Sequence, residues 1–233
     1  MILHYCHPRN DRQLPCDAFA LQGDPLAAGR RLNFHDPLKG YSVGTSTSVG
    51  ANLLIEDFPW LELSIIESGE LSVQGEDFAL NLKAGDCFVV PRGAAVRWQH
   101  RGQLQRVFIA FPGLLASQLD RRPMKIDLEQ TLRPSEPPAA SVLLTPAPDS
   151  WSETLLTLGD LRIGLWECEP YTRKQVQPSY TELMFLLEGS VTLTPEQGDP
   201  VRAGSNEVVV VPAGTTNAWS STERVRKVFC ILA

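Results

Sequence analysis

The chain has 233 residues, with 21 Lys and Arg against 27 Asp and Glu, and its formal net charge at pH 7 is −6. Acidic and basic residues are interspersed, so no basic stripe indicates a nucleic-acid interface, and no stretch approaches the ~18 apolar residues of a membrane helix. The five cysteines are scattered without Cys-x-x-Cys spacing, and the N-terminus lacks the features of a signal peptide. These observations predict a reduced, cytoplasmic globular protein with no nucleic-acid partner and no membrane partner.

Short predicted strands follow one another along most of the chain, separated by turn signals rich in Gly, Pro and Asp. In chain order they cover residues 61–66, 71–73, 78–82, 87–90 and 106–111, and then 183–187, 191–194, 208–211 and 227–232. Helical periodicity is scarce, and the best candidate is residues 114–119. Many short strands at regular spacing predict an all-β protein made of sandwiches or barrels.

The strand pattern occurs twice. A Glu-x6-Gly segment begins at Glu62 and again at Glu182, which is 182 − 62 = 120 residues later. A Pro-x-Gly-x4-Trp segment ends at Trp98 and again at Trp219, 121 residues later. Matches held in register over so long a stretch indicate that a whole domain was duplicated. We therefore predict an N-terminal arm (1–41), an N-terminal barrel (42–111), a proline-rich linker (112–156) and a C-terminal barrel (157–233).

These repeated segments resemble the two motifs of the cupin superfamily. The Glu-x6-Gly segments are similar to the end of its first motif, and the Pro-x-Gly turns are similar to its second. The second copy also resembles the branch that includes ureidoglycine aminohydrolase and the ethanolamine-utilisation cupins, in the segments that begin at Trp166 (WECEP), Pro212 (PAGT) and Val225 (VRKV). The resemblance implies two tandem cupin domains, each a jelly-roll β-barrel.

Cupins of this kind bind a metal through three histidines and one glutamate, and this chain has lost the histidines. The resemblance places the four ligand positions of the second copy on Gln175, Gln177, Asn217 and Glu182, and those of the first copy on Ile55, Asp57, Val96 and Glu62. Amide oxygens are poor ligands for transition metals, which prefer imidazole or thiolate. We therefore expect no metal and no cofactor.

The four histidines of the chain lie outside these ligand positions. They are His4, His7, His35 and His100. We interpret each as a surface or hydrogen-bonded residue. His100 leaves an alternative open, because an imidazole close to Glu62 inside a barrel would form an acid–base couple.

Polar side chains are expected to gather inside the second barrel. Alternate residues of a strand share a face, and the family geometry directs all five candidates into one cavity: Gln175, Gln177, Glu182, Asn217 and Trp219. Buried polar groups need partners, so this cluster indicates either a closed hydrogen-bond network or a polar ligand. Glu182 favours a ligand with an amine, amide or hydroxyl group, and Trp219 can add a cation–π contact. Lys227 is expected to pair with a carboxylate of the barrel.

Three functions are compatible with the sequence. The first is a bicupin that binds a small polar, nitrogen-containing metabolite in its C-terminal barrel without a transition metal. The second is a metal-dependent hydrolase of the ureidoglycine aminohydrolase type; a metal-free lyase or isomerase that uses Glu182 as a base is a further alternative. The third is a structural, homodimeric cupin without a ligand.

Overall fold

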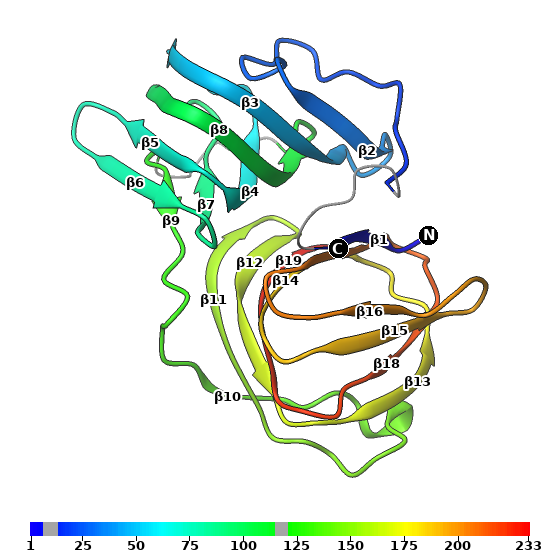
Figure 1. Cartoon of the computed structure of the whole chain (residues 1–233). Coiled ribbons are helices and arrows are strands. Elements are labelled where there is room, and N and C mark those ends of the chain that lie inside the picture. Colours follow the sequence, from blue (N-terminus) through cyan, green and yellow to red (C-terminus); the bar gives the residue numbers. More distant parts are fainter. Residues whose placement is uncertain (7–13, 115–120) are drawn as a thin grey trace. The chain divides into compact units, whose positions relative to one another are not determined.

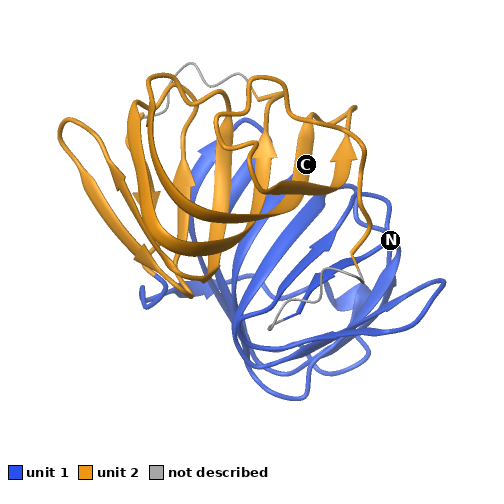
Figure 2. Cartoon of the chain, turned by 45° about the horizontal axis from the view of Figure 1, so that its top comes forward, with its two compact units in different colours: residues 1–11, 128–233 blue, residues 12–127 orange. Residues whose placement is uncertain are grey.

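The computed structural model describes residues 1–6, 14–114 and 121–233, and the chain forms two compact units (Figures 1 and 2). The unit of residues 12–127 is called the N-terminal barrel below; residues 1–11 and 128–233 form the C-terminal barrel. The only helical element among the described residues is a 3-10 helix, η2, at Ala140–Val142. The predicted all-β architecture of two tandem cupin barrels is confirmed. The helix predicted at 114–119 lies, apart from Leu114, outside the described residues.

The N-terminal barrel is built from eight described strands. They are β2 (Arg30–Asp36), β3 (Tyr41–Ile55), β4 (Leu61–Ser68), β5 (Glu70–Gln74), β6 (Ala79–Lys83), β7 (Cys87–Val90), β8 (Val96–Phe111) and β9 (Met124–Lys125). The order across the sheet is β2-β3-β8-β4-β7-β9, and β5 pairs with both β6 and β8. The long strands β3 and β8 pair from end to end, with one register shift at Gly50, whose φ of 64° favours glycine.

The C-terminal barrel has two sheets that face each other in Figure 1. The seven-stranded sheet consists of β1 (Leu3–Tyr5), β17 (Val208–Val211), β14 (Thr181–Glu188), β19 (Val225–Leu232), β12 (Leu161–Cys168), β11 (Ser150–Leu158) and β10 (Arg133–Ser135), in that order. The four-stranded sheet consists of β13 (Thr172–Val176), β18 (Asn217–Ser220), β15 (Val191–Pro195) and β16 (Val201–Ala203).

The two barrels have register shifts at equivalent places in their strand ladders. The β2–β3 ladder has a bulge between residues 32 and 34, and the equivalent β11–β12 ladder has one between residues 154 and 156. The β4–β8 ladder is shifted between residues 66 and 68, and the β14–β19 ladder between residues 186 and 188. Bulges at matching places in all four ladders confirm the duplication that the sequence indicates.

Segments predicted to be an arm and a linker contain several strands. Residues 1–41 supply β1 to the C-terminal barrel, where it pairs with β17, and β2 to the N-terminal barrel, where it pairs with β3. Residues 112–156 supply β9, β10 and most of β11. Pro134 lies in β10 at the edge of its sheet, where a missing N–H costs no ladder hydrogen bond.

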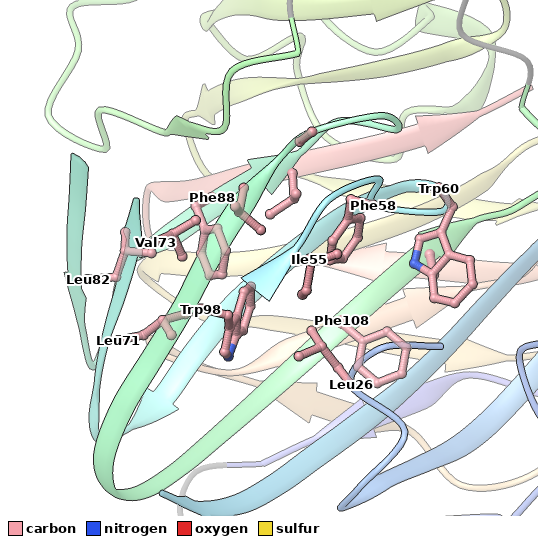
Figure 3. Close-up of a cluster of buried hydrophobic side chains, with 14 of the residues drawn as sticks. Leu26, Ile55, Phe58, Trp60, Leu71, Val73, Leu82, Phe88, Trp98 and Phe108 are labelled. Carbon is pink, nitrogen blue, oxygen red and sulfur yellow. The ribbon is translucent and has the colours of Figure 1, made fainter. Parts of the chain in front are cut away.

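The interior of the N-terminal barrel is filled by apolar side chains. Figure 3 shows Phe58, Phe88, Trp98 and Phe108 among the aliphatic residues of this cluster. The apolar cluster of the C-terminal barrel is smaller and includes Trp219. In the part of the chain that the structure describes, no helix is long and apolar enough to cross a membrane.

Candidate functional site

The C-terminal barrel encloses a cavity of about 500 Å³. This volume lies within the ~300–1,000 Å³ that small-molecule sites usually have. Aromatic rings form much of its wall, namely Trp166, Tyr171, Tyr180, Trp219 and Phe229. Five charged side chains also line it, namely Glu136, Arg162, Arg173, Glu182 and Lys227. The cavity therefore combines flat apolar surfaces with charged groups of both signs.

A buried ion pair crosses the wall of this cavity. Lys227 on β19 donates from Nζ to Glu182 Oε1 on the neighbouring β14 at 2.8 Å, and the two side chains are only 8% and 16% exposed. The ammonium also lies 4.7 Å from the ring centroid of Trp166 and 5.1 Å from that of Trp219. The expected pairing of Lys227 with a barrel carboxylate is thus confirmed. Within the described residues, Glu182 Oε2 has no hydrogen-bond partner.

Asn217 is fully paired and holds a second cation against the cavity. Its backbone oxygen and its side-chain Oδ1 accept hydrogen bonds from the Arg173 guanidinium at 2.6 and 2.8 Å. Its amide nitrogen donates to the carbonyl oxygen of Thr215 at 2.9 Å. Asn217 therefore positions Arg173 in the cavity wall, and its own polar atoms are already engaged.

Trp219 leaves one hydrogen-bond donor unpaired at this site. Its ring stacks on Tyr171, with centroids 5.6 Å apart, and meets Trp166 edge to face at 6.0 Å. The indole Nε1 is buried, and no acceptor reaches it within the described chain. An unpaired buried donor costs roughly 1–3 kcal/mol, which an acceptor atom in the cavity would recover.

The neighbouring phenols remain neutral donors. Burial raises the pKa of Tyr171 above its ordinary value, and the negative charge of Glu182 adds to this effect. The pKa of Tyr180 is raised as well, first by the charge of Glu182 and then by burial. Both hydroxyl groups are therefore protonated at neutral pH.

Gln175 and Gln177 lie outside the cavity, which corrects the placement expected from strand alternation. Both side chains are exposed, and their amides donate to backbone carbonyl oxygens at 3.0 and 3.2 Å. The β13–β18 ladder shifts register between Arg173 and Val176, and these two residues line the cavity instead. The irregularity rotates the strand, so simple alternation fails at this point.

The groups in this cavity do not suit a transition metal. The Lys227 ammonium lies 2.8 Å from the Glu182 carboxylate, where it would repel a divalent cation, and Arg173 already occupies the Asn217 oxygens. Within residues 1–6, 14–114 and 121–233, no three His, Cys, Asp or Glu side chains gather closely enough to hold a metal ion.

Each described histidine has a hydrogen-bond partner. His4 contacts Glu207 at 3.0 Å, and His35 contacts Ser42 at 2.9 Å. His100 is bound between the Ser48 hydroxyl and the backbone oxygen of residue 102, so neither imidazole nitrogen is left for an acid–base couple with Glu62. His7 lies outside the described residues.

In the N-terminal barrel, side chains of the protein itself fill the equivalent site. Glu62 is completely buried, and it accepts hydrogen bonds from Arg106 at Oε1 (2.9 Å) and from Arg30 at Oε2 (2.7 Å). Trp60 donates to Oε2 as well, at 3.1 Å. Burial alone would raise the pKa of Glu62, but the two guanidinium groups lower it to about 2. The largely apolar interior of this barrel therefore contains a buried cluster of charged side chains.

Sequence reasoning missed two important contributors to these sites. Tyr171 directly precedes β13 and lies two residues before Arg173, a signal that could have placed it in the C-terminal cavity. Arg30 lies upstream of the recognised repeat, where no motif points to it.

Known proteins resemble this chain in both sequence and fold. The family described as EutQ-like cupin domain matches residues 156–229. A protein of unknown function from Pseudomonas syringae pv. tomato, of the DUF861 family, is 30% identical, with 94% of this chain and 91% of that chain covered and a TM-score of 0.84. None of the curated proteins matches this chain.

Two more distant structures share the fold. The Escherichia coli protein Ylba, also of the DUF861 family, is 10% identical over 94% of this chain and 89% of its own, with a TM-score of 0.59. A cupin 2 conserved barrel domain protein from Leptotrichia buccalis is 14% identical over 88% of each chain, with a TM-score of 0.58.

Proposed function

Since the chain belongs to the DUF861 family of cupins, we propose that its C-terminal barrel binds a small polar, nitrogen-containing metabolite without a transition metal. The observation that carries this proposal is a pair of groups on two residues that line the cavity, a buried donor without an acceptor and a carboxylate oxygen without a donor from the part of the chain that the structure describes. The indole N–H of Trp219 lacks an acceptor, and Oε2 of Glu182 lacks a donor, among the described residues. A ligand with an acceptor at one end and an N–H group at the other would satisfy both.

The aromatic wall supports the same proposal. Trp166, Tyr171 and Trp219 pack against one another in stacked and edge-to-face arrangements, which keeps their rings in place before a ligand enters. Rigid rings lose little conformational entropy on binding, so a preformed aromatic wall favours affinity. The ion pair between Lys227 and Glu182 also supports the proposal, because it can orient a polar ligand while the two charges neutralise each other.

Metal-dependent hydrolysis fits this cavity less well. Such chemistry needs a Lewis acid to activate water, and among the described residues no three His, Cys, Asp or Glu side chains gather to hold a metal ion. Reversible binding by the cavity needs no group beyond the side chains that line it.

A thermal-shift screen with a library of nitrogen-containing metabolites tests the proposal. A ligand present at 100 times its Kd stabilises the protein by about 2.7 kcal/mol, which raises the melting temperature by several degrees. Trp219→Phe keeps an aromatic side chain, although a smaller one, and deletes the N–H, so we expect weaker binding of the ligand found. Trp98→Phe, at the equivalent position of the N-terminal barrel, is the matched control and should leave binding unchanged. A library without a single stabilising compound would refute the proposal.

A further inference from the structure

The duplication allows the two barrels to be compared residue by residue. Arg30 on β2 pairs with Ser46 on β3, and Ser152 on β11 pairs with Trp166 on β12. Ser46 and Trp166 are 166 − 46 = 120 residues apart, the same interval as Glu62 and Glu182. Ser152 of the C-terminal barrel therefore occupies the position that Arg30 has in the N-terminal barrel.

In the N-terminal barrel a guanidinium group fills this position. Arg30 donates from Nη2 to Oε2 of Glu62 at 2.7 Å, and its Cζ lies 4.1 Å from the ring centroid of Phe108. Its Nε is 3.1 Å from Oδ2 of Asp24, and its side chain is only 4% exposed. A planar cation is thus held between two carboxylates and an aromatic face.

The C-terminal barrel has counterparts of the residues that surround the Arg30 guanidinium, but it has no arginine at the position of Arg30. Glu182 corresponds to Glu62, and Phe229 corresponds to Phe108, 121 residues later. Both line the cavity, as does Ser152, whose side chain is far too short to reach Glu182 in the way Arg30 reaches Glu62. Glu136 supplies a second carboxylate to the cavity wall.

Each barrel also has a second cationic side chain, Arg106 or Lys227, and it contacts the glutamate of its barrel in the same way in both barrels. Arg106 donates to Oε1 of Glu62 and lies 4.7 Å from the ring of Trp98, and Lys227 donates to Oε1 of Glu182 and lies 5.1 Å from the ring of Trp219. In both barrels this cation leaves Oε2 for another donor. In the N-terminal barrel the donors to Oε2 are Arg30 and Trp60.

We propose that the C-terminal cavity binds a small molecule through a guanidinium or amidinium group, which sits between Glu182 and Phe229 as the Arg30 side chain does in the N-terminal barrel. This inference rests on the proposed function and names its ligand class. A planar cation supplies N–H donors to Oε2 of Glu182 and a positive charge to the Phe229 ring. An acceptor elsewhere on the same molecule, such as a carboxylate, would meet the indole N–H of Trp219 and the cationic side chains of the wall. Guanidino acids combine both features.

Isothermal titration calorimetry with two isosteric probes tests this inference. Guanidinoacetate and N-carbamoylglycine have nearly the same shape and the same carboxylate, and they differ in the charge and donor count of the planar group. We expect guanidinoacetate to bind at least tenfold more tightly, and Glu182→Gln to abolish that preference. Equal binding, or tighter binding of N-carbamoylglycine, would overturn the inference and leave the proposed function standing. Failure of both probes together with the whole metabolite library would overturn both proposals.

Substitutions at Ser152 provide a second test, which reads out thermal stability as well as binding of the probe. Ser152→Arg places a guanidinium on the strand position that Arg30 occupies, and we expect it to raise the melting temperature and to block guanidinoacetate. Ser152→Met has similar length without charge and should block the probe without that stabilisation. If Ser152→Arg is no more stable than Ser152→Met, or is equally stable when combined with Glu182→Gln, then the cavity does not accept a guanidinium at Glu182 and the inference is refuted.

Discussion

Glu62 should make the stability of the N-terminal barrel strongly dependent on acid pH. Its carboxylate is completely buried, and the guanidinium groups of Arg30 and Arg106 hold its pKa at about 2, against an ordinary value of 4.5. A carboxyl whose pKa is lowered in the folded state stabilises the fold above its unfolded pKa. This contribution is therefore complete above about pH 4.5 and is lost as the pH falls towards 2.

The magnitude follows from the difference in pKa. A difference of 4.5 − 2, about 2.5 units, corresponds to about 3.4 kcal/mol of unfolding free energy at 1.36 kcal/mol per unit. Between pH 4.5 and pH 3 the loss is about 2 kcal/mol. Glu62→Gln removes the titrating group, and it also leaves two buried arginines with one carboxylate fewer, which costs about 3–5 kcal/mol at neutral pH.

Urea unfolding followed by tryptophan fluorescence at several pH values between 6 and 3 measures this effect. We expect the stability difference between the natural protein and Glu62→Gln to shrink by about 2 kcal/mol from pH 4.5 to pH 3. Burial raises the pKa of Asp24 and the charge of Glu62 adds to this rise, so Asp24 acts in the opposite direction and makes the measured change slightly smaller. Glu76→Gln, at an exposed position of the same barrel, controls for the substitution itself. A stability difference that stays constant from pH 6 to pH 3 would refute the reasoning.

Two further substitutions test the packing of the C-terminal barrel. An ideal Cβ at Gly164 would lie 2.2 Å from a backbone oxygen of β11, so we expect Gly164→Ala to lower the unfolding free energy by about 1–3 kcal/mol. Gly204→Ala, with nothing within 4 Å, should be nearly neutral in the same denaturation experiment. Leu3 on β1 is 1% exposed, and Leu3→Ala should destabilise this barrel by about 2–5 kcal/mol, whereas Met1→Ala, at a 71% exposed position, should have little effect on thermal melting.

The duplicated architecture could be predicted because its signals are local and strong. Gly69 and Gly189 have φ values of 92° and 75°, and a Cβ there would lie 2.2 and 2.1 Å from backbone oxygens, so these turns require glycine. The strands after these turns are buried on alternate or all residues, and their apolar pattern is clear in the sequence. The resemblance to the cupin motifs implies that Glu182, Asn217 and Trp219 share a cavity, and all three residues line it.

Three features that depend on long-range pairing could not be predicted from local sequence patterns. The register shift in β13 depends on how that strand pairs with β18, so it exposes Gln175 and Gln177 although alternation points them inward. Strand β1 has three residues, too few to show any periodicity, and it pairs with β17 about 200 positions later. The role of Arg30 is likewise a long-range property, because its partner Glu62 is 32 residues away on another strand.

The comparison of the two barrels explains how one duplicated fold can serve two purposes. The N-terminal barrel satisfies its buried carboxylate with Arg30 and Arg106, so its interior is closed and its charges are balanced within the chain. The C-terminal barrel has Ser152 in place of the first arginine, and it keeps an open oxygen on Glu182 and an unpaired N–H on Trp219. Among the described residues, buried donors without a hydrogen-bond partner occur in both barrels, on Arg30 and Arg31 as well as on Trp219, so the cavity beside Glu182 is what distinguishes the C-terminal barrel. This difference supports the binding role that we propose for the C-terminal barrel.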